Sequence, residues 1–139
     1  MRFANEDCWG TLSCCLLAHP WVGETLHDEL DRAVTHLRYG TVAVNAWPAL
    51  GYAQASTTWG AYPGHTPEDI QSGTGVVHNA LLFDHPQKSV IWAPFRPLAK
   101  PGYFADHKTL AKLGQAMLEH EQAPSLGSAL RVALAGARG

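Results

Sequence analysis

The sequence lacks the local patterns by which phosphate loops and metal centres are usually recognised. It contains no Gly-x-Gly-x-x-Gly or Walker-type loop, and no two of its eight histidines have the spacing of a helical His-x-x-x-His pair. Its three cysteines do not combine with histidines in the spacing of zinc ligands. These absences argue against a phosphate-binding loop or a metal site that is built by a short contiguous motif.

Charged residues are also scarce. Asp, Glu, Lys and Arg make up 16% of the chain, and the net charge of −2 gives no electrostatic reason to expect a nucleic-acid partner or an anionic membrane. By contrast, 46% of the 139 residues are apolar and five are tryptophan. This composition predicts a globular chain with a real core and with some apolar surface that meets a partner.

The three cysteines, Cys8, Cys14 and Cys15, form an odd and tightly clustered set that does not suit a disulfide framework. They indicate a reducing compartment, and we expect a cytoplasmic protein because the first residues do not resemble a signal peptide. Cys14 and Cys15 are expected on opposite faces of a buried strand, where free cysteines usually act as small hydrophobic residues. A small enzyme that uses these thiols is therefore the least favoured of the functions considered below.

The segment 37–45, Leu-Arg-Tyr-Gly-Thr-Val-Ala-Val-Asn, organises the rest of the prediction. Gly40 is expected to end a helix with a positive φ, and the run 41–44 is expected to form a buried strand. Asn45 then lies at the carboxyl end of this strand, where open α/β sheets place ligands. Its amide either belongs to an ordinary turn or holds a functional loop in place, and the sequence leaves both interpretations open.

The residues before this segment predict a strand and a helix. The apolar run 11–18 is typical of a buried strand, and Thr25 with Asp28 has the form of a capping box that begins a helix. The apolar face of that helix consists of four residues at helical spacing, Leu26, Leu30, Val34 and Leu37. The expected order is therefore strand, helix and strand, with the two strands parallel.

The residues after this segment predict a loop, a short helix and a last strand. The loop 46–64 is rich in Trp, Tyr, Pro and Gly, and its length favours a functional loop. Thr66 followed by Pro67 predicts the start of a short helix, and the glycines of 60–64 and 73–75 are interpreted as turn residues. The run 88–93 predicts a strand.

A helical extension is expected after this strand. A linker over 99–105 is followed by one helix over 106–121 and by another that begins at Pro124 and Ser125. The last four residues are expected to fray. At the other end, residues 3–5 resemble the last turn of a helix, which suggests a fragment or a split gene.

Several of these segments, in this order, resemble the aldehyde dehydrogenase superfamily. Ala4-Asn5 followed by Trp9-Gly10-Thr11-Leu12 resembles the family's AN…YGL segment, and residues 40–45 are similar to its G-x-V-x-V-N strand. Trp59-Gly60-Ala61-Tyr62 resembles its PFGG turn, and residues 88–91 resemble its terminal strand. The resemblance covers about residues 3–93 and implies an α/β fold.

In that family a separate domain binds NAD(P), a cysteine attacks the aldehyde and a glutamate acts as the base. These groups lie upstream of the matched segments, so the resemblance implies no catalytic, cofactor-binding or metal-binding residue in this chain. It implies instead that Asn45 positions the catalytic loop. The residues expected to line the aldehyde tunnel are Leu50, Tyr52 and Trp59.

The expected organisation is a partial aldehyde-dehydrogenase-like catalytic domain over 1–97 and a helical C-terminal extension over 98–139. The first hypothesis is a C-terminal fragment of an NAD(P)-dependent aldehyde dehydrogenase that is inactive alone and contributes a tunnel loop and an oligomerisation strand. Its partner is then the remainder of the dehydrogenase or a second copy of the chain. The alternative is a non-enzymatic interaction module or subunit derived from that domain.

Overall fold

The computed structural model describes residues 1–97 and 104–137, and the chain divides into two compact units. Unit 1 comprises residues 1–95 and unit 2 comprises residues 96–139. Most of the expected linker 99–105, and residues 138 and 139 of the expected frayed end, lie outside the described residues. Among the residues that are described, no helix is both long and apolar enough to cross a lipid bilayer.

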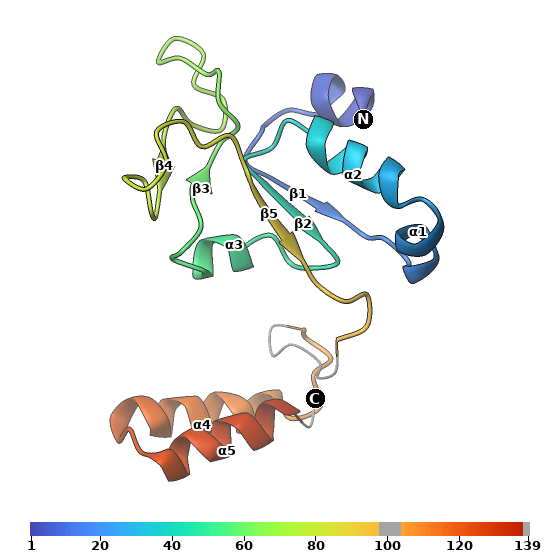
Figure 1. Cartoon of the computed structure of the whole chain (residues 1–139). Coiled ribbons are helices and arrows are strands. Elements are labelled where there is room, and N and C mark those ends of the chain that lie inside the picture. Colours follow the sequence, from blue (N-terminus) through green and yellow to red (C-terminus); the bar gives the residue numbers. More distant parts are fainter. Residues whose placement is uncertain (98–103, 138–139) are drawn as a thin grey trace. The chain divides into compact units, whose positions relative to one another are not determined.

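Unit 1 is a mixed α/β structure and unit 2 is a pair of helices (Figure 1). The elements in chain order are η1 (Phe3–Asp7), β1 (Ser13–Leu16), α1 (Pro20–Thr25), α2 (His27–His36), β2 (Thr41–Val44), α3 (Leu50–Ala53), β3 (Trp59–Gly60), β4 (Val76–Val77), β5 (Ser89–Trp92), α4 (Leu110–Gln122) and α5 (Leu126–Ala137). The α/β class expected from the sequence is confirmed at this level.

A three-stranded parallel sheet forms the centre of unit 1, with β2 between β1 and β5. In register, Thr41 lies between Ser13 and Ser89, and Val44 lies between Leu16 and Trp92. The expected strands 11–18, 41–44 and 88–93 are therefore present. The first is shorter than expected, and the expectation that it is buried is wrong, because none of its four residues is buried and Cys15 is exposed. A small antiparallel pair, β3 and β4, lies beside this sheet.

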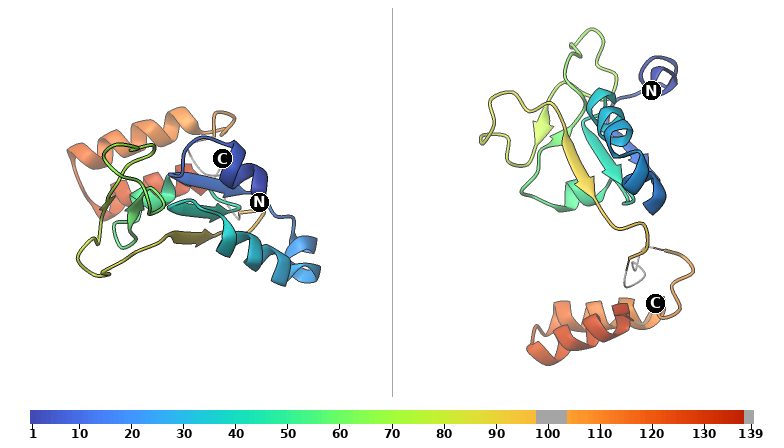
Figure 2. Two further views of the ribbon diagram at one scale, coloured as in Figure 1. Left: turned by 90° about the horizontal axis from the view of Figure 1, so that it is seen from above. Right: turned by 45° about the vertical axis from the view of Figure 1, so that its right-hand side comes forward.

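The two faces of β2 are covered by different elements (Figure 2). Val42 and Val44 face α2 and join a buried core with Val34 and Leu37 of the helix side, as the helical spacing predicts. On the opposite face, Gly51 of α3 lies close to Thr41 and Ile91, because a Cβ atom added to this glycine would be only 3.1 Å and 3.2 Å from their side chains. Since all four residues of β2 are buried, this strand is the centre of unit 1.

The start of α2 differs from the expected capping box. Thr25 ends the preceding helix α1, and its hydroxyl donates to the carbonyl of Trp21 at 2.7 Å. Pro20, expected to end the first strand, occupies the first turn of α1, where its missing N–H costs no helical hydrogen bond. The residue before it, His19, accepts the Trp21 N–H through Nδ1 and caps α1.

The end of α2 also differs from the expectation. Gly40 was expected to stop the helix with a positive φ, but the helix ends at His36 and Gly40 is not among the residues with positive φ. Side chains from distant segments satisfy the free carbonyls instead. Lys88 Nζ donates to Val34, Thr35 and Leu37, and the Asn5 amide donates to His36 at 2.9 Å. Together these two side chains complete the hydrogen bonding of the last turn.

Gly40 is required for a different reason. A Cβ atom at this position would lie 1.8 Å from the carbonyl oxygen of Gly60, the last residue of β3. The backbone of the long loop therefore passes directly over the start of β2, and only glycine leaves room for it. The sequence predicts that Gly40 is needed for its backbone conformation, whereas the structure shows that it is needed because a side chain would not fit.

The region 46–77 is more ordered than a simple loop. It contains α3, β3 and β4. Gly64 and Gly73 have φ of 119° and 125°, as expected of turn residues, whereas Gly60, also expected in a turn, lies in β3. The helix expected at Thr66 is absent. Thr66 and Asp69 close a single turn through their backbones, and the Thr66 hydroxyl accepts the Asp69 N–H at 3.3 Å.

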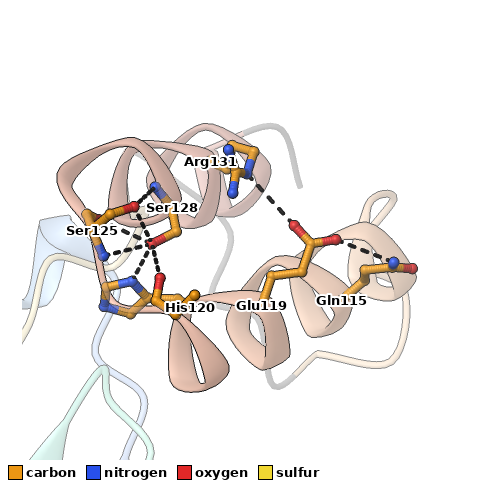
Figure 3. A network of polar contacts seen from close by, with 7 residues as sticks. Gln115, Glu119, His120, Ser125, Ser128 and Arg131 are labelled. Atoms are coloured by element: carbon orange, nitrogen blue, oxygen red, sulfur yellow. Dashed lines mark hydrogen bonds and ion pairs between the residues drawn. The ribbon is translucent and has the colours of Figure 1, made fainter.

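Unit 2 consists of α4 and α5, close to the two helices that the sequence predicts. The start of α5 is held by a reciprocal pair of serines (Figure 3). Ser125 Oγ accepts the Ser128 N–H at 3.1 Å, and Ser128 Oγ accepts the Ser125 N–H at 3.0 Å. His120 Nδ1 lies 2.7 Å from the same buried Ser128 hydroxyl and ties α4 to this turn.

Candidate functional site

Asn45 lies at the carboxyl edge of the sheet, where the sequence places it. It has φ of 59°, a left-handed conformation that asparagine tolerates better than most residues. Its Oδ1 accepts the Ala18 N–H at 2.8 Å, and its Nδ2 donates to the Ala18 carbonyl at 3.0 Å. The amide therefore clamps the chain that leaves β1.

The same edge gathers groups that follow the other two strands. The rings of His19, after β1, and Phe95, after β5, meet edge to face with centroids 5.3 Å apart. The Cys15 thiol donates to the Ala46 carbonyl at 3.3 Å. The loops that leave all three parallel strands thus contact one another around Asn45.

The residues expected to line a tunnel lie on α3 and β3. Tyr52 and Trp59 contact each other edge to face with ring centroids 5.9 Å apart, and the Tyr52 ring also lies 4.7 Å from that of His78. Tyr52 is 55% exposed and Trp59 is half-buried. Leu50, the first residue of α3, is half-buried as well. The structure therefore brings Tyr52 and Trp59 together as an aromatic surface and adds His78 to it.

A cavity of about 240 Å³ lies among the glycine-rich turns. Its lining includes His65, Asp84 and His85 together with residues 61–64 and 73–76. His65 Nε2 is 2.7 Å from the Thr11 hydroxyl, which fixes this ring against the chain before β1. Within the part of the chain that the structure describes, no group of three or more His, Cys, Asp or Glu side chains could hold a metal ion.

Cys14 does not have the environment of an activated thiol. Burial raises the pKa of the Cys14 thiol, and the neighbouring Cys15 and Cys8 raise it further. A nucleophilic cysteine needs the opposite shift, because the thiolate is the reactive form. Cys14 packs against the core on the α2 side while Cys15 is exposed, in agreement with the expected opposite faces.

Two positioning residues escaped the sequence analysis. Lys88 was expected only as the start of a strand, yet it is half-buried at the end of α2, and burial lowers the pKa of its ammonium group. His78, with φ of 59° and its Nδ1 atom buried, is one of the eight histidines that show no metal-ligand spacing in the sequence. Neither residue has a local pattern that reveals its contacts, because each contact joins segments 26 or more residues apart.

Comparison of the chain with protein-family models, with curated proteins and with solved structures finds no match.

Proposed function

We propose that this chain supplies the substrate-tunnel loop and an edge strand of the catalytic domain of an NAD(P)-dependent aldehyde dehydrogenase. The observation that carries the proposal is the carboxyl edge of the parallel sheet. There the amide of Asn45 clamps Ala18 with two hydrogen bonds, at the strand end where open α/β sheets place ligands. An amide that fixes one loop with both of its polar ends is well suited to positioning a neighbouring catalytic loop.

The aromatic surface supports the same proposal. Tyr52 and Trp59, on α3 and β3, form an apolar face of the kind that lines a site for small organic substrates. The high pKa of Cys14 favours an arrangement in which the nucleophile comes from another part of the assembled enzyme. In this proposal the chain orients and encloses an aldehyde, while NAD(P) and the reacting thiol are held by the remainder of the dehydrogenase.

The first test is an assay of the purified chain with NAD, NADP and short aldehydes. We expect no reduction of either cofactor. Turnover by the chain alone would refute the proposal, and serine replacements of the three cysteines would then show whether a thiol carries the reaction.

The second test uses the chain in its native assembly. A tagged chain is purified with its partners, and NAD(P)-dependent oxidation of aldehydes is measured for Tyr52→Ala and for Phe83→Ala, an exposed aromatic control in unit 1. We expect the Tyr52 change to raise KM for the aldehyde with little change in kcat, and the Phe83 change to leave both unaltered. An assembly without such activity refutes the proposal.

A non-enzymatic interaction module is the second candidate, and the edge strand β5 favours it. In the described part of the chain β5 pairs with β2 alone, and its Val90 and Trp92 are 39% and 53% exposed. An exposed apolar edge strand is a common docking surface for another chain. A stable assembly that forms through β5 but does not oxidise aldehydes supports this candidate.

A further inference from the structure

The helix α5 is apolar almost all the way round, although it lies at the surface of unit 2. Its twelve residues include one charged side chain, that of Arg131. Leu126, Leu130 and Leu134 are 92%, 59% and 47% exposed. A helix with this composition is usually covered by other protein, because its exposed leucines have no favourable contact with water.

Six of the exposed residues of α5 form two neighbouring columns with different shapes. The leucines at positions 126, 130 and 134 recur every four residues and make a ridge along the helix. The alanines at positions 129, 133 and 137, all of them exposed, recur with the same spacing and make a shallow groove beside the ridge. The residues between these columns and α4, including Val132 and Ala135, are half-buried within the hairpin.

We propose that α5 is a self-association surface, on which a second copy of this chain packs its own α5 in antiparallel orientation. In such a pair, centred on the midpoint of the helix, Leu126 faces Ala137, Leu130 faces Ala133 and Leu134 faces Ala129. Each ridge therefore fits the groove of the other copy. A two-fold axis requires this kind of self-complementary surface.

The charges of α5 and the area of its exposed leucines are consistent with a second copy of the chain as the partner. Arg131 lies off the paired columns and is 3.6 Å from Glu119 of its own hairpin, so the pairing brings no like charges together (Figure 3). A single cation also gives little attraction to an anionic lipid surface. If a fully exposed leucine offers about 200 Å², the three leucines leave about 400 Å² accessible, about half of what each partner buries in a standard interface. The alanine column adds to this area, and the contact belongs to the weak and reversible class.

The inference does not depend on the proposed dehydrogenase function, and it is tested on the full chain by sedimentation velocity over a range of concentrations. We expect a reversible monomer–dimer equilibrium in the micromolar range. Leu130→Glu raises the dissociation constant by about 30-fold or more, as loss of a central interface residue does. The matched control is Leu81→Glu, at a leucine of unit 1 that is fully exposed, and it leaves the constant unchanged.

Two further variants keep the test independent of folding defects. Ala133→Leu adds apolar area and costs little helix propensity but fills the groove, so it weakens the specific dimer while helicity by circular dichroism is retained. Mixing Leu130→Glu chains with Ala133→Lys chains restores a dimer, because the new charges face each other in the antiparallel register. A chain that is monomeric at every concentration, a tighter dimer in Ala133→Leu, or no rescue on mixing overturns the inference.

Discussion

The replacement of Lys88 by methionine tests whether unit 1 depends on a contact between the end of α2 and the start of β5. The ammonium group has three N–H donors, and all three point to carbonyl oxygens, those of Val34, Thr35 and Leu37. Methionine keeps most of the aliphatic stem but removes these donors. It also removes the positive charge that faces the negative end of the helix dipole.

The expected loss follows from the chemistry of these three contacts. A hydrogen bond from a charged donor contributes about 1.5–3 kcal/mol to stability, but three bonds to one ammonium group are not additive. Lys88 is only half-buried, and water solvates part of what the substitution exposes. We therefore expect the free energy of unfolding of unit 1 to fall by about 2–3 kcal/mol. For a cooperative unit of this size, that loss lowers Tm by about 10–20 °C.

Urea unfolding followed by tryptophan fluorescence measures this loss directly. All five tryptophans precede residue 95, so their emission reports on unit 1. The control is Arg32→Met, which removes an exposed cation from α2 within the same unit, and for which we expect a change within about 0.5 kcal/mol. An equal, small effect of both substitutions would refute the reasoning that Lys88 completes the last turn of α2.

Three other predictions concern the sheet and its thiols. Gly40→Ala places a Cβ against backbone and should lower the free energy of unfolding by about 3 kcal/mol or more. Gly23→Ala, in open space on α1, should raise it by about 0.5–1 kcal/mol. The urea midpoints of the two variants measure this difference. Asn45→Gly keeps the positive φ but loses both bonds to Ala18, for a loss of about 1–2 kcal/mol. Asn45→Ala should lose about 1 kcal/mol more through backbone strain, and equal losses contradict this. Because the folded state raises the pKa of Cys14, iodoacetamide should label it more slowly than the two exposed thiols. The same raised pKa means that the Cys14 thiol contributes to the free energy of unfolding at pH values below its ordinary pKa, and that this contribution is lost as the pH rises through the pKa of the folded state. Unfolding curves measured at increasing pH above about 8.5 detect this loss.

The sequence predicts the sheet well because the signal for it is local. A buried parallel strand needs a short run of β-branched and small apolar residues, and residues 41–44 provide one. The spacing of Leu30, Val34 and Leu37 likewise identifies the face of α2 that joins the core. The helices of unit 2 follow from the same kind of periodicity.

The ends of the helices are predicted less well, because their hydrogen-bond partners are distant in sequence. The Thr25 pattern and the position of Gly40 both suggest local helix signals, yet the carbonyls at the end of α2 bond to Lys88 and Asn5. The first of these partners follows α2 by about fifty residues and the second precedes it. A capping motif read from neighbouring residues cannot identify partners of this kind.

The candidate site was predicted in part for the same reason. The strand pattern places Asn45 at the carboxyl edge of the sheet, but its bonds to Ala18 depend on the path of the chain after β1. The pairing of Tyr52 with His78 depends on how β4 returns beside β3. Local sequence therefore predicts that Asn45 lies at this strand end, and long-range packing decides which side chains meet there.

The residues that hold the backbone of unit 1 together, which we call its frame, differ from those of its exposed aromatic surface. Asn45 at the carboxyl edge and Lys88 at the opposite end of the sheet use their polar atoms on backbone groups within unit 1. Tyr52, in contrast, is more than half exposed and contacts other rings. Substitutions in the frame should therefore change stability first, whereas Tyr52→Ala should leave the unfolding midpoint nearly unchanged. If Tyr52→Ala unfolds unit 1 as readily as Lys88→Met, the aromatic surface is part of the core, and its proposed role in enclosing a substrate loses its structural basis.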